Sequence, residues 1–182
     1  IKRFQKFHSD LGFIKERITE TLGDLYGMHW PYKQHRTSRN IKKLPYHESL
    51  KSFGACFGVS GGYERPMWFA LDGEKAEYDY SYNFQNWYPS VEYETDNTIK
   101  NVGLFDLTPF SKFEIKSNKA HKELQRICTA NIKNEIGKCT YTHMLNMDGG
   151  IETDLTVVCV DNNYFRIISS AATRERDKFH IR

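Results

Sequence analysis

The chain has 182 residues, and its 26 Lys and Arg residues against 23 Asp and Glu residues give a formal net charge of +3. Eleven Tyr and twelve Phe supply far more buryable surface than a disordered chain carries, so we expect a folded protein. The charge excess is too small to indicate a nucleic-acid partner. There is no run of 18 apolar residues and no charged-then-apolar leader, so we expect no membrane span; the opening at Ile1 indicates a piece of a longer polypeptide.

The first quarter of the chain predicts one helix and then an extended connector. Apolar residues recur every three or four positions over residues 9–26, Ser9 or Asp10 can cap the start, and Gly27 can end the helix. These apolar residues are Ile14, Ile18, Leu22 and Leu25. The stretch "MHWPYKQHRTSRNIKKLPYH" (28–47) has two prolines and no clear period, so we expect a basic connector that lies along a surface.

The middle of the chain predicts short helices and strands without regular alternation. We expect helices over residues 47–53, 91–101 and 118–129, and strands at "MWFAL" (67–71) and "FSKFEIKS" (110–117). Because no repeated strand–helix–strand unit appears, a parallel sheet is not expected.

The last third of the chain predicts a three-stranded antiparallel meander. Its strands are "KCTYTHMLN" (138–146), "IETDLTVVCV" (151–160) and "YFRIISS" (164–170), separated by turns at "MDGG" and "DNN". A further helix starts in "AATRERDKF" (171–179). The fold class is therefore α+β, with a mainly antiparallel sheet and flanking helices.

One carboxylate interrupts the apolar second strand of this meander. Alternation places Asp154 and Thr156 on one face of the strand and Leu155 on the other. If the preceding loop holds four residues, 146–149, Tyr141 lies directly opposite Asp154. Such a pair could hold a ligand amine in a sheltered pocket, because an ionised carboxylate only accepts hydrogen bonds. The alternative is a solvated carboxylate at the mouth of a strand.

Other residue types give weaker indications. The cysteines form no C-x-x-C pair and have apolar neighbours, so we expect reduced core thiols and no metal site; they are Cys56, Cys128, Cys139 and Cys159. His143 is expected to be a packed or edge histidine. The basic stretch 33–43 could meet phosphates, but a solvated connector is the simpler interpretation because no RNA-binding motif accompanies it. No phosphate-cradling glycine loop or nucleophile elbow is present.

Three segments together resemble a known family. They are "GACFGVSGGYERPMWFA" (54–70), "VGLFDLTPFSKFEI" (102–115) and "YTHMLNMDGGIETDLTVV" (141–158). They are similar to the folate-binding module of glycine-cleavage T-proteins (aminomethyltransferases), and more so to that of dimethylglycine and sarcosine dehydrogenases or oxidases. Residues 1–45 resemble the helix and connector that follow the flavin half of those two-headed enzymes, and residues 46–182 the N-terminal part of the folate-binding domain, truncated at its C-terminus.

The resemblance implies roles for particular residues. The family's carboxylate near the reactive edge of tetrahydrofolate corresponds to Asp154, which would be catalytic, and its pterin-side tyrosine to Tyr141. A pocket-lining methionine of the T-proteins falls at Phe110, where this sequence departs from the pattern. Thr156, on the Asp154 face, would line the same pocket.

The resemblance also implies an activity. The longer enzyme would oxidise a methylated amine with FAD held before Ile1, and tetrahydrofolate would capture the one-carbon unit as 5,10-methylene-tetrahydrofolate. The partners would be folate and the amine, with no nucleic acid and no membrane, in the cytoplasm or the mitochondrial matrix. The isolated chain would be inactive and could self-associate. Three alternatives stay open: a plain aminomethyltransferase, a non-catalytic folate-binding module, and a nucleic-acid binder.

Overall fold

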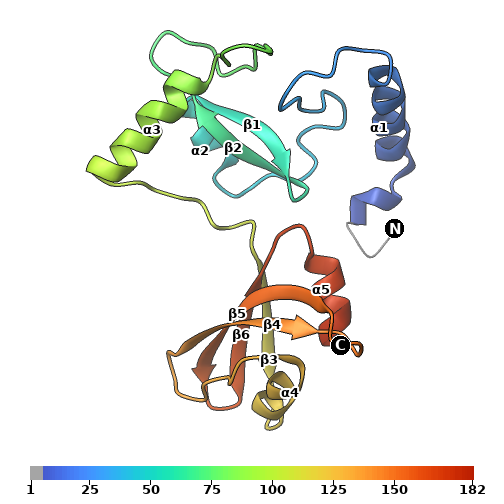
Figure 1. Cartoon of the computed structure of the whole chain (residues 1–182), viewed down its shortest axis with the longest axis vertical. Coiled ribbons are helices and arrows are strands. Elements are labelled where there is room, and N and C mark those ends of the chain that lie inside the picture. The colour runs from blue at the N-terminus through green and yellow to red at the C-terminus, as the bar shows by residue number, and fades with distance from the viewer. Residues whose placement is uncertain (1–5) are drawn as a thin grey trace. The chain divides into compact units, whose positions relative to one another are not determined.

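The computed structural model describes residues 6–182, which form two compact units, residues 6–108 and residues 109–182 (Figure 1). In both units the strands are antiparallel and helices flank them, so the predicted α+β class is confirmed. Within the described residues, no helix is both long enough and apolar enough to cross a membrane.

The unit of residues 6–108 is built around one β-hairpin. Strands β1 and β2 pair through a turn at Gly61 and Gly62, both of which have positive φ. Its elements are the 3-10 helix η1 (Lys6–Ser9), α1 (Leu11–Asp24), α2 (His47–Ser52), β1 (Ala55–Ser60), β2 (Tyr63–Phe69) and α3 (Tyr88–Lys100). The predicted helices are confirmed; α3 begins three residues earlier than expected because Pro89 is accepted in a first helical turn.

Helix α1 starts as predicted, with the carboxylate of Asp10 accepting a hydrogen bond of 2.8 Å from the backbone N–H of Phe13. The side of α1 that is buried is not the side formed by the apolar residues whose spacing predicts the helix. Ile18 and Leu22 are 52% and 56% exposed, whereas the buried residue of the helix is Glu20.

The connector between α1 and α2 contains no helix or strand, as expected, and lies between α1 and the hairpin (Figure 1). The side chain of Gln34 accepts from the backbone N–H of Val59 at 3.0 Å, which fastens the connector to β1. Arg39 donates two hydrogen bonds to the carboxylate of buried Glu64 in β2, at 2.8 and 2.6 Å. The connector is therefore part of the packed unit.

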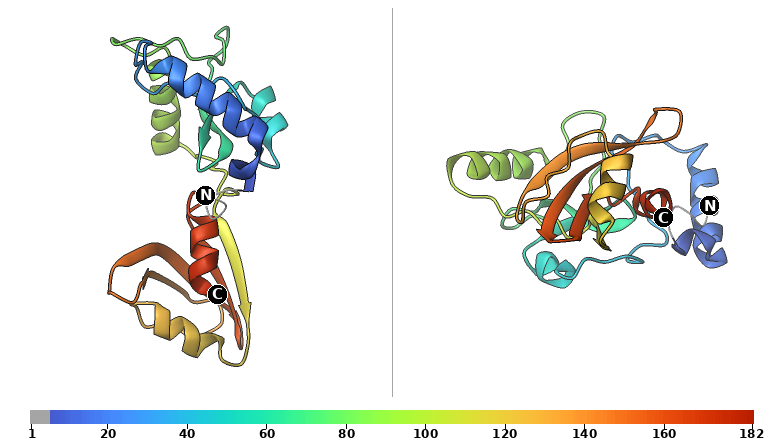
Figure 2. Two further views of the ribbon diagram at one scale, coloured as in Figure 1. Left: turned by 90° about the vertical axis from the view of Figure 1, so that its right-hand side faces the viewer. Right: turned by 90° about the horizontal axis from the view of Figure 1, so that it is seen from below.

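The unit of residues 109–182 contains a four-stranded sheet in the order β3-β6-β5-β4. The predicted meander is confirmed as its last three strands. The elements are β3 (Ser111–Lys116), α4 (Ala120–Ile127), β4 (Cys139–Leu145), β5 (Ile151–Asp161), β6 (Tyr164–Ser169) and α5 (Arg174–Ile181). Both helices of this unit lie beside the sheet (Figure 2).

One face of this sheet carries the core. Thr153, Leu155 and Val157 alternate on β5 and are buried, while the residues between them are at least partly exposed. Leu124 of α4 packs into the same cluster, and burial of one such side chain contributes about 1.5–3 kcal/mol. The other buried members are Ala120, Cys128, Ile132, Met144, Cys159, Phe165 and Ile167. Cys139 is a correction to the expected set of core thiols, because it is exposed on β4.

Candidate functional site

The register of β4 and β5 decides what Asp154 meets. His143 lies directly opposite Asp154, and Tyr141 lies opposite Thr156. The expectation that Tyr141 faces Asp154 directly is therefore wrong by two residues. Because side chains alternate with a period of two, a shift of two keeps Tyr141 and Asp154 on the same face.

The loop between the strands and the irregularity that follows it each account for one residue of the shift. The loop holds five residues, 146–150, because Leu145 pairs with Ile151, and an irregularity follows that leaves Glu152 out of the pairing. The side-chain oxygen of Asn146 accepts from the backbone N–H groups of Asp148 and Gly150, at 3.0 and 2.8 Å. The predicted turn is confirmed, but it is one residue longer than expected since this side chain organises it.

Tyr141 and Asp154 are nonetheless in contact. The phenol donates a hydrogen bond of 3.1 Å to Oδ2 of Asp154. This bond and the negative charge of the carboxylate raise the pKa of Tyr141. The phenol is thus held protonated and the carboxylate is left with acceptor positions for a second donor.

The shelter that the sequence analysis predicts is not found around this pair within residues 6–182. Tyr141 is 63% exposed, and Asp154 is also exposed on the open face of the sheet. A cavity of about 790 Å³ lies in the other unit, beside Arg39 and Glu64, and neither member of the pair lines it. The solvated-strand interpretation of Asp154 therefore describes this chain taken by itself.

Phe110 and Thr156 belong to the same face of the sheet. Phe110 directly precedes β3, next to buried Ser111, and is 40% exposed. Continuing the register by one residue beyond the paired positions puts Phe110 in line with Ser170 and Asp154. The four predicted site residues therefore share one face at one end of the sheet, in two adjacent rows.

His143 is a site residue that the sequence analysis did not select. It is half-buried opposite Asp154, and its ring lies 5.7 Å from that of Tyr141 at an interplanar angle of 70°. Both the loop length and the irregularity at Glu152 would have had to be known to show that His143, and not Tyr141, pairs with Asp154. The site is thus a carboxylate flanked by two aromatic rings.

This set of groups fits a reduced pterin. A flat, amine-bearing ring needs aromatic surface beside it and hydrogen-bond acceptors at its edge. Tyr141 and Phe110 supply the first, and Asp154 supplies the second. Within the described residues, no group of three or more His, Cys, Asp or Glu side chains is placed to hold a metal ion.

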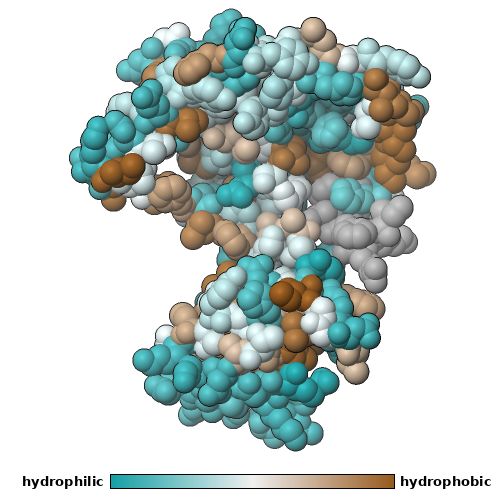
Figure 3. Space-filling view, in the orientation of Figure 1, coloured by the Kyte–Doolittle hydropathy of each residue, from teal (hydrophilic) through white to brown (hydrophobic). Residues whose placement is uncertain are grey.

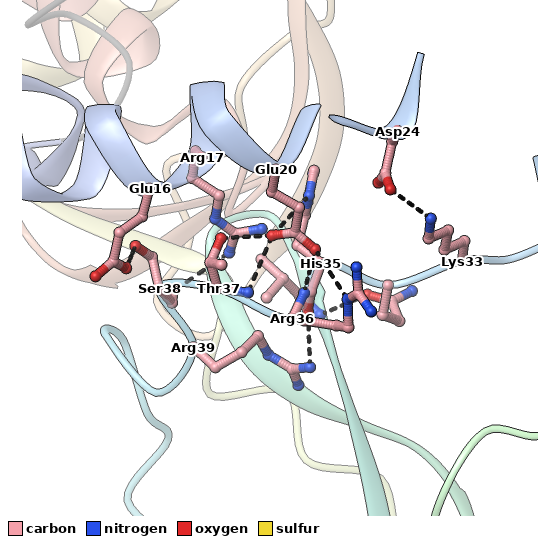
Figure 4. Close-up of polar contacts among 12 residues, drawn as sticks. Glu16, Arg17, Glu20, Asp24, Lys33, His35, Arg36, Thr37, Ser38 and Arg39 are labelled. Carbon is pink, nitrogen blue, oxygen red and sulfur yellow. Dashed lines mark hydrogen bonds and ion pairs between the residues drawn. The ribbon is translucent and has the colours of Figure 1, made fainter. Parts of the chain in front are cut away.

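The basic connector forms a second polar cluster, which Figure 4 shows beneath α1. Glu20 accepts hydrogen bonds from the backbone N–H groups of Arg36 and Thr37, at 2.6 and 3.0 Å, and from the hydroxyl of Thr37. Burial by itself raises the pKa of Glu20, but these hydrogen bonds outweigh it and lower the pKa from 4.5 to about 2. Lys33 pairs with Asp24 at 2.7 Å.

Several cations of the basic stretch are therefore partnered within their own unit. Arg39 pairs with Glu64, and Lys43 with Glu48 at 2.8 Å. Cations held in this way are less available to a phosphate backbone than free ones.

Two family models match the sequence. Residues 46–182 match the GCVT N-terminal domain, and residues 1–43 match the FAD dependent oxidoreductase central domain. The first match covers most of the chain, which therefore belongs to the GCVT N-terminal domain family. Helix α1 and most of the connector fall inside the second match.

Curated relatives match this chain along most of its length. The chain is 37% identical to 4-methylaminobutanoate oxidase (formaldehyde-forming) from Paenarthrobacter nicotinovorans, over 100% of the chain and 22% of that protein. It is 32% identical to mitochondrial dimethylglycine dehydrogenase from Rattus norvegicus, over 91% of the chain and 19% of that protein. It is 29% identical to mitochondrial sarcosine dehydrogenase from Homo sapiens, over 84% and 20%. The chain thus spans about a fifth of the length of these relatives.

A solved structure shares the fold. Aminomethyltransferase T of the glycine cleavage system from Bartonella henselae matches with a TM-score of 0.62 and 23% sequence identity, over 78% of this chain and 34% of that one. The resemblance to T-proteins and to dimethylglycine and sarcosine dehydrogenases is therefore confirmed, and the fold is that of a T-protein.

Proposed function

We propose that the chain is the folate-binding part of a flavin-dependent N-methyl-amine oxidoreductase. Its outer sheet face would bind tetrahydrofolate, which supplies the nitrogen atoms that take up the one-carbon unit as 5,10-methylene-tetrahydrofolate. The observation that carries the proposal is the contact between Tyr141 and Asp154 on one face with Phe110 and Thr156. The family membership and the names of the relatives support it.

The chain's own residues would bind the ligand, orient it and assist proton transfer at its nitrogen. The carboxylate of Asp154 would accept an N–H of the ligand and favour positive charge at that nitrogen. Tyr141 fixes the direction of the carboxylate through its hydrogen bond, and His143, on the same strand as Tyr141, lies directly opposite Asp154. Since Asp154 is exposed in this chain, further parts of the longer protein would have to exclude water from the site.

The test uses the holoenzyme, in which this sequence is joined to its flavin-binding part. Asp154→Asn should weaken tetrahydrofolate binding and slow methylene-tetrahydrofolate formation by about 10²–10⁴-fold, the range for acid–base assistance. The matched control is Glu114→Gln on β3, because Glu114 is exposed and pairs with Arg166, away from Asp154. Unchanged folate affinity and product formation in Asp154→Asn would overturn the proposal.

The fate of the one-carbon unit needs its own measurement, because the relative from Paenarthrobacter nicotinovorans is named formaldehyde-forming. Amine oxidation should be followed with and without tetrahydrofolate, with free formaldehyde measured in both. Our proposal requires that tetrahydrofolate lower free formaldehyde in wild type and do so much less in Asp154→Asn. Equal formaldehyde release under all four conditions would show that no capture occurs.

A second candidate function is a non-catalytic folate sensor. It is favoured by a relative that is named as a regulatory subunit: pyruvate dehydrogenase phosphatase regulatory subunit from Mus musculus is 28% identical over 93% of the chain and 20% of that protein. Folate binding in a holoenzyme that oxidises no methylated amine would support this candidate over the first. Its compartment would be the one we propose for the enzyme, the cytoplasm or the mitochondrial matrix.

A further inference from the structure

Helix α1 presents its polar side to its own unit and its apolar side outward. Glu16, Glu20 and Asp24 are spaced by four residues and all bind the connector. At 3.6 residues per turn, each of the large exposed aliphatic residues points within about 40° of the direction opposite Glu20 around the helix axis. These outward residues are Leu11, Ile18, Leu22 and Leu25, and we call them the outer face of α1.

The polar contacts fix this orientation. The carboxylate of Glu20 accepts three hydrogen bonds, and Glu16 accepts one from the hydroxyl of Ser38 at 2.5 Å (Figure 4). Rotating α1 to bury its aliphatic residues would break these bonds and leave the connector N–H groups without their acceptor. Leaving such donors unsatisfied costs about 1–3 kcal/mol each, so the helix stays with its apolar side outward.

The outer face of α1 is a continuous apolar strip. Its members are between 52% and 81% exposed, and Figure 3 shows hydrophobic surface along the helix. Full burial of an exposed aliphatic side chain contributes about 1.5–3 kcal/mol, so covering the exposed part of each of these side chains favours association with another surface. Contiguous apolar patches on a folded protein mark interaction sites.

The comparisons indicate what covers it. All of α1 lies in the match to the FAD dependent oxidoreductase central domain, and the relatives are about five times as long as this chain. We propose that the outer face of α1 is the surface on which the FAD-binding part of the longer protein packs. The inference rests on the proposed function, because it requires that part to be present.

Cysteine labelling in the holoenzyme tests the contact. Leu22→Cys should react with a maleimide at least tenfold more slowly in the folded protein than after unfolding. The matched control is Ile99→Cys on α3, which is 76% exposed and outside the proposed surface, and should react quickly in both states. Mass mapping separates these sites from the native exposed Cys139. Equal rates for the two variants in the folded holoenzyme would overturn the proposal.

A photocrosslinking amino acid in place of Leu22 identifies the occupant. Adducts with peptides of the FAD-binding part are expected, whereas adducts with α1 of a second copy would overturn the proposal in favour of self-association. Ile18→Asp should also lower the temperature at which flavin is released, while Ile99→Asp should not; equal flavin release temperatures would contradict the contact. Neither variant touches Asp154, so loss of this contact and loss of folate capture are measured separately.

Discussion

The phenol of Tyr141 donates a hydrogen bond to the carboxylate of Asp154 across two rows of the same sheet face. This contact joins two adjacent strands, β4 and β5, whose pairing is set by the loop at Asn146 and by the irregularity at Glu152. The contact between the phenol and the carboxylate therefore depends on a turn and an irregularity that lie outside the pair.

The first prediction concerns the ionisation of Tyr141. Its pKa is raised by the hydrogen bond to Asp154 and by the charge there, so Asp154→Asn should lower the pKa of the phenol toward its ordinary value of 10. Ring-labelled tyrosine followed by NMR over an alkaline titration measures this residue individually. Glu114→Gln is the control, since Glu114 binds Tyr164 and should leave the Tyr141 titration unchanged.

The second prediction concerns acid stability. The pKa of Glu20 is lowered to about 2 in the folded protein, so the unfolded state binds the proton more readily. The stabilisation is complete above the unfolded pKa of 4.5 and is lost as the pH falls toward 2, and it amounts to at most about 3 kcal/mol. Glu20→Gln should lower the free energy of unfolding near pH 7 by up to about that amount.

The pH dependence separates this effect from a general defect. The difference in unfolding free energy between wild type and Glu20→Gln should shrink between pH 5 and pH 2, measured by denaturant titration. Glu16→Gln, on the same side of α1 but exposed, should change stability by only about 0.5 kcal/mol. A constant difference at every pH would contradict the role of the Glu20 carboxylate.

The third prediction uses two glycines that differ in backbone conformation. Gly149 has φ of 80° in the β4–β5 loop, whereas Gly23 lies in α1, and a methyl group at either position would meet no atom within 4 Å. Gly149→Ala should destabilise by about 1–2 kcal/mol because it forces a left-handed conformation. Gly23→Ala should stabilise by up to about 1 kcal/mol because alanine is the better helix former. Thermal unfolding of both variants shows whether stability falls in Gly149→Ala and rises in Gly23→Ala.

The fourth prediction locates the core of the second unit. Leu124 is 1% exposed beneath the sheet, so Leu124→Ala should cost about 2–5 kcal/mol in unfolding free energy. Leu104 is fully exposed, and Leu104→Ala should change it by less than about 0.5 kcal/mol. Similar losses in the two variants would show that Leu124 does not pack as described.

Local patterns predicted the elements well. Alternation on β5 separates buried Leu155 from exposed Asp154, and Asp10 caps α1 as its position indicates. The register was harder to predict, because the pairing moves by two residues for two separate reasons. The loop organised by Asn146 is one residue longer than expected, and an irregularity at Glu152 adds a second residue. Pattern alone does not reveal such a side chain-to-backbone bond.

The burial of α1 could not be predicted from its periodicity. Spacing shows that Ile18 and Leu22 share a side, but it does not say which surface covers that side. The same holds for Asp154, whose expected shelter is not supplied by the residues described. Both differences concern surfaces that we propose are covered by other parts of a longer protein.

The two family matches meet at residues 43–46. The hydrogen bonds of the connector show that this point does not separate two independently packed parts of the chain. Severing the polypeptide there would strip buried Glu64 of the guanidinium of Arg39 and of the N–H of Asn40, and would deprive Val59 of Gln34. A carboxylate orphaned in a nonpolar interior must either take up a proton or open the hairpin around it. A fragment meant to keep the β1–β2 hairpin intact would therefore have to include residues 34–40 as well.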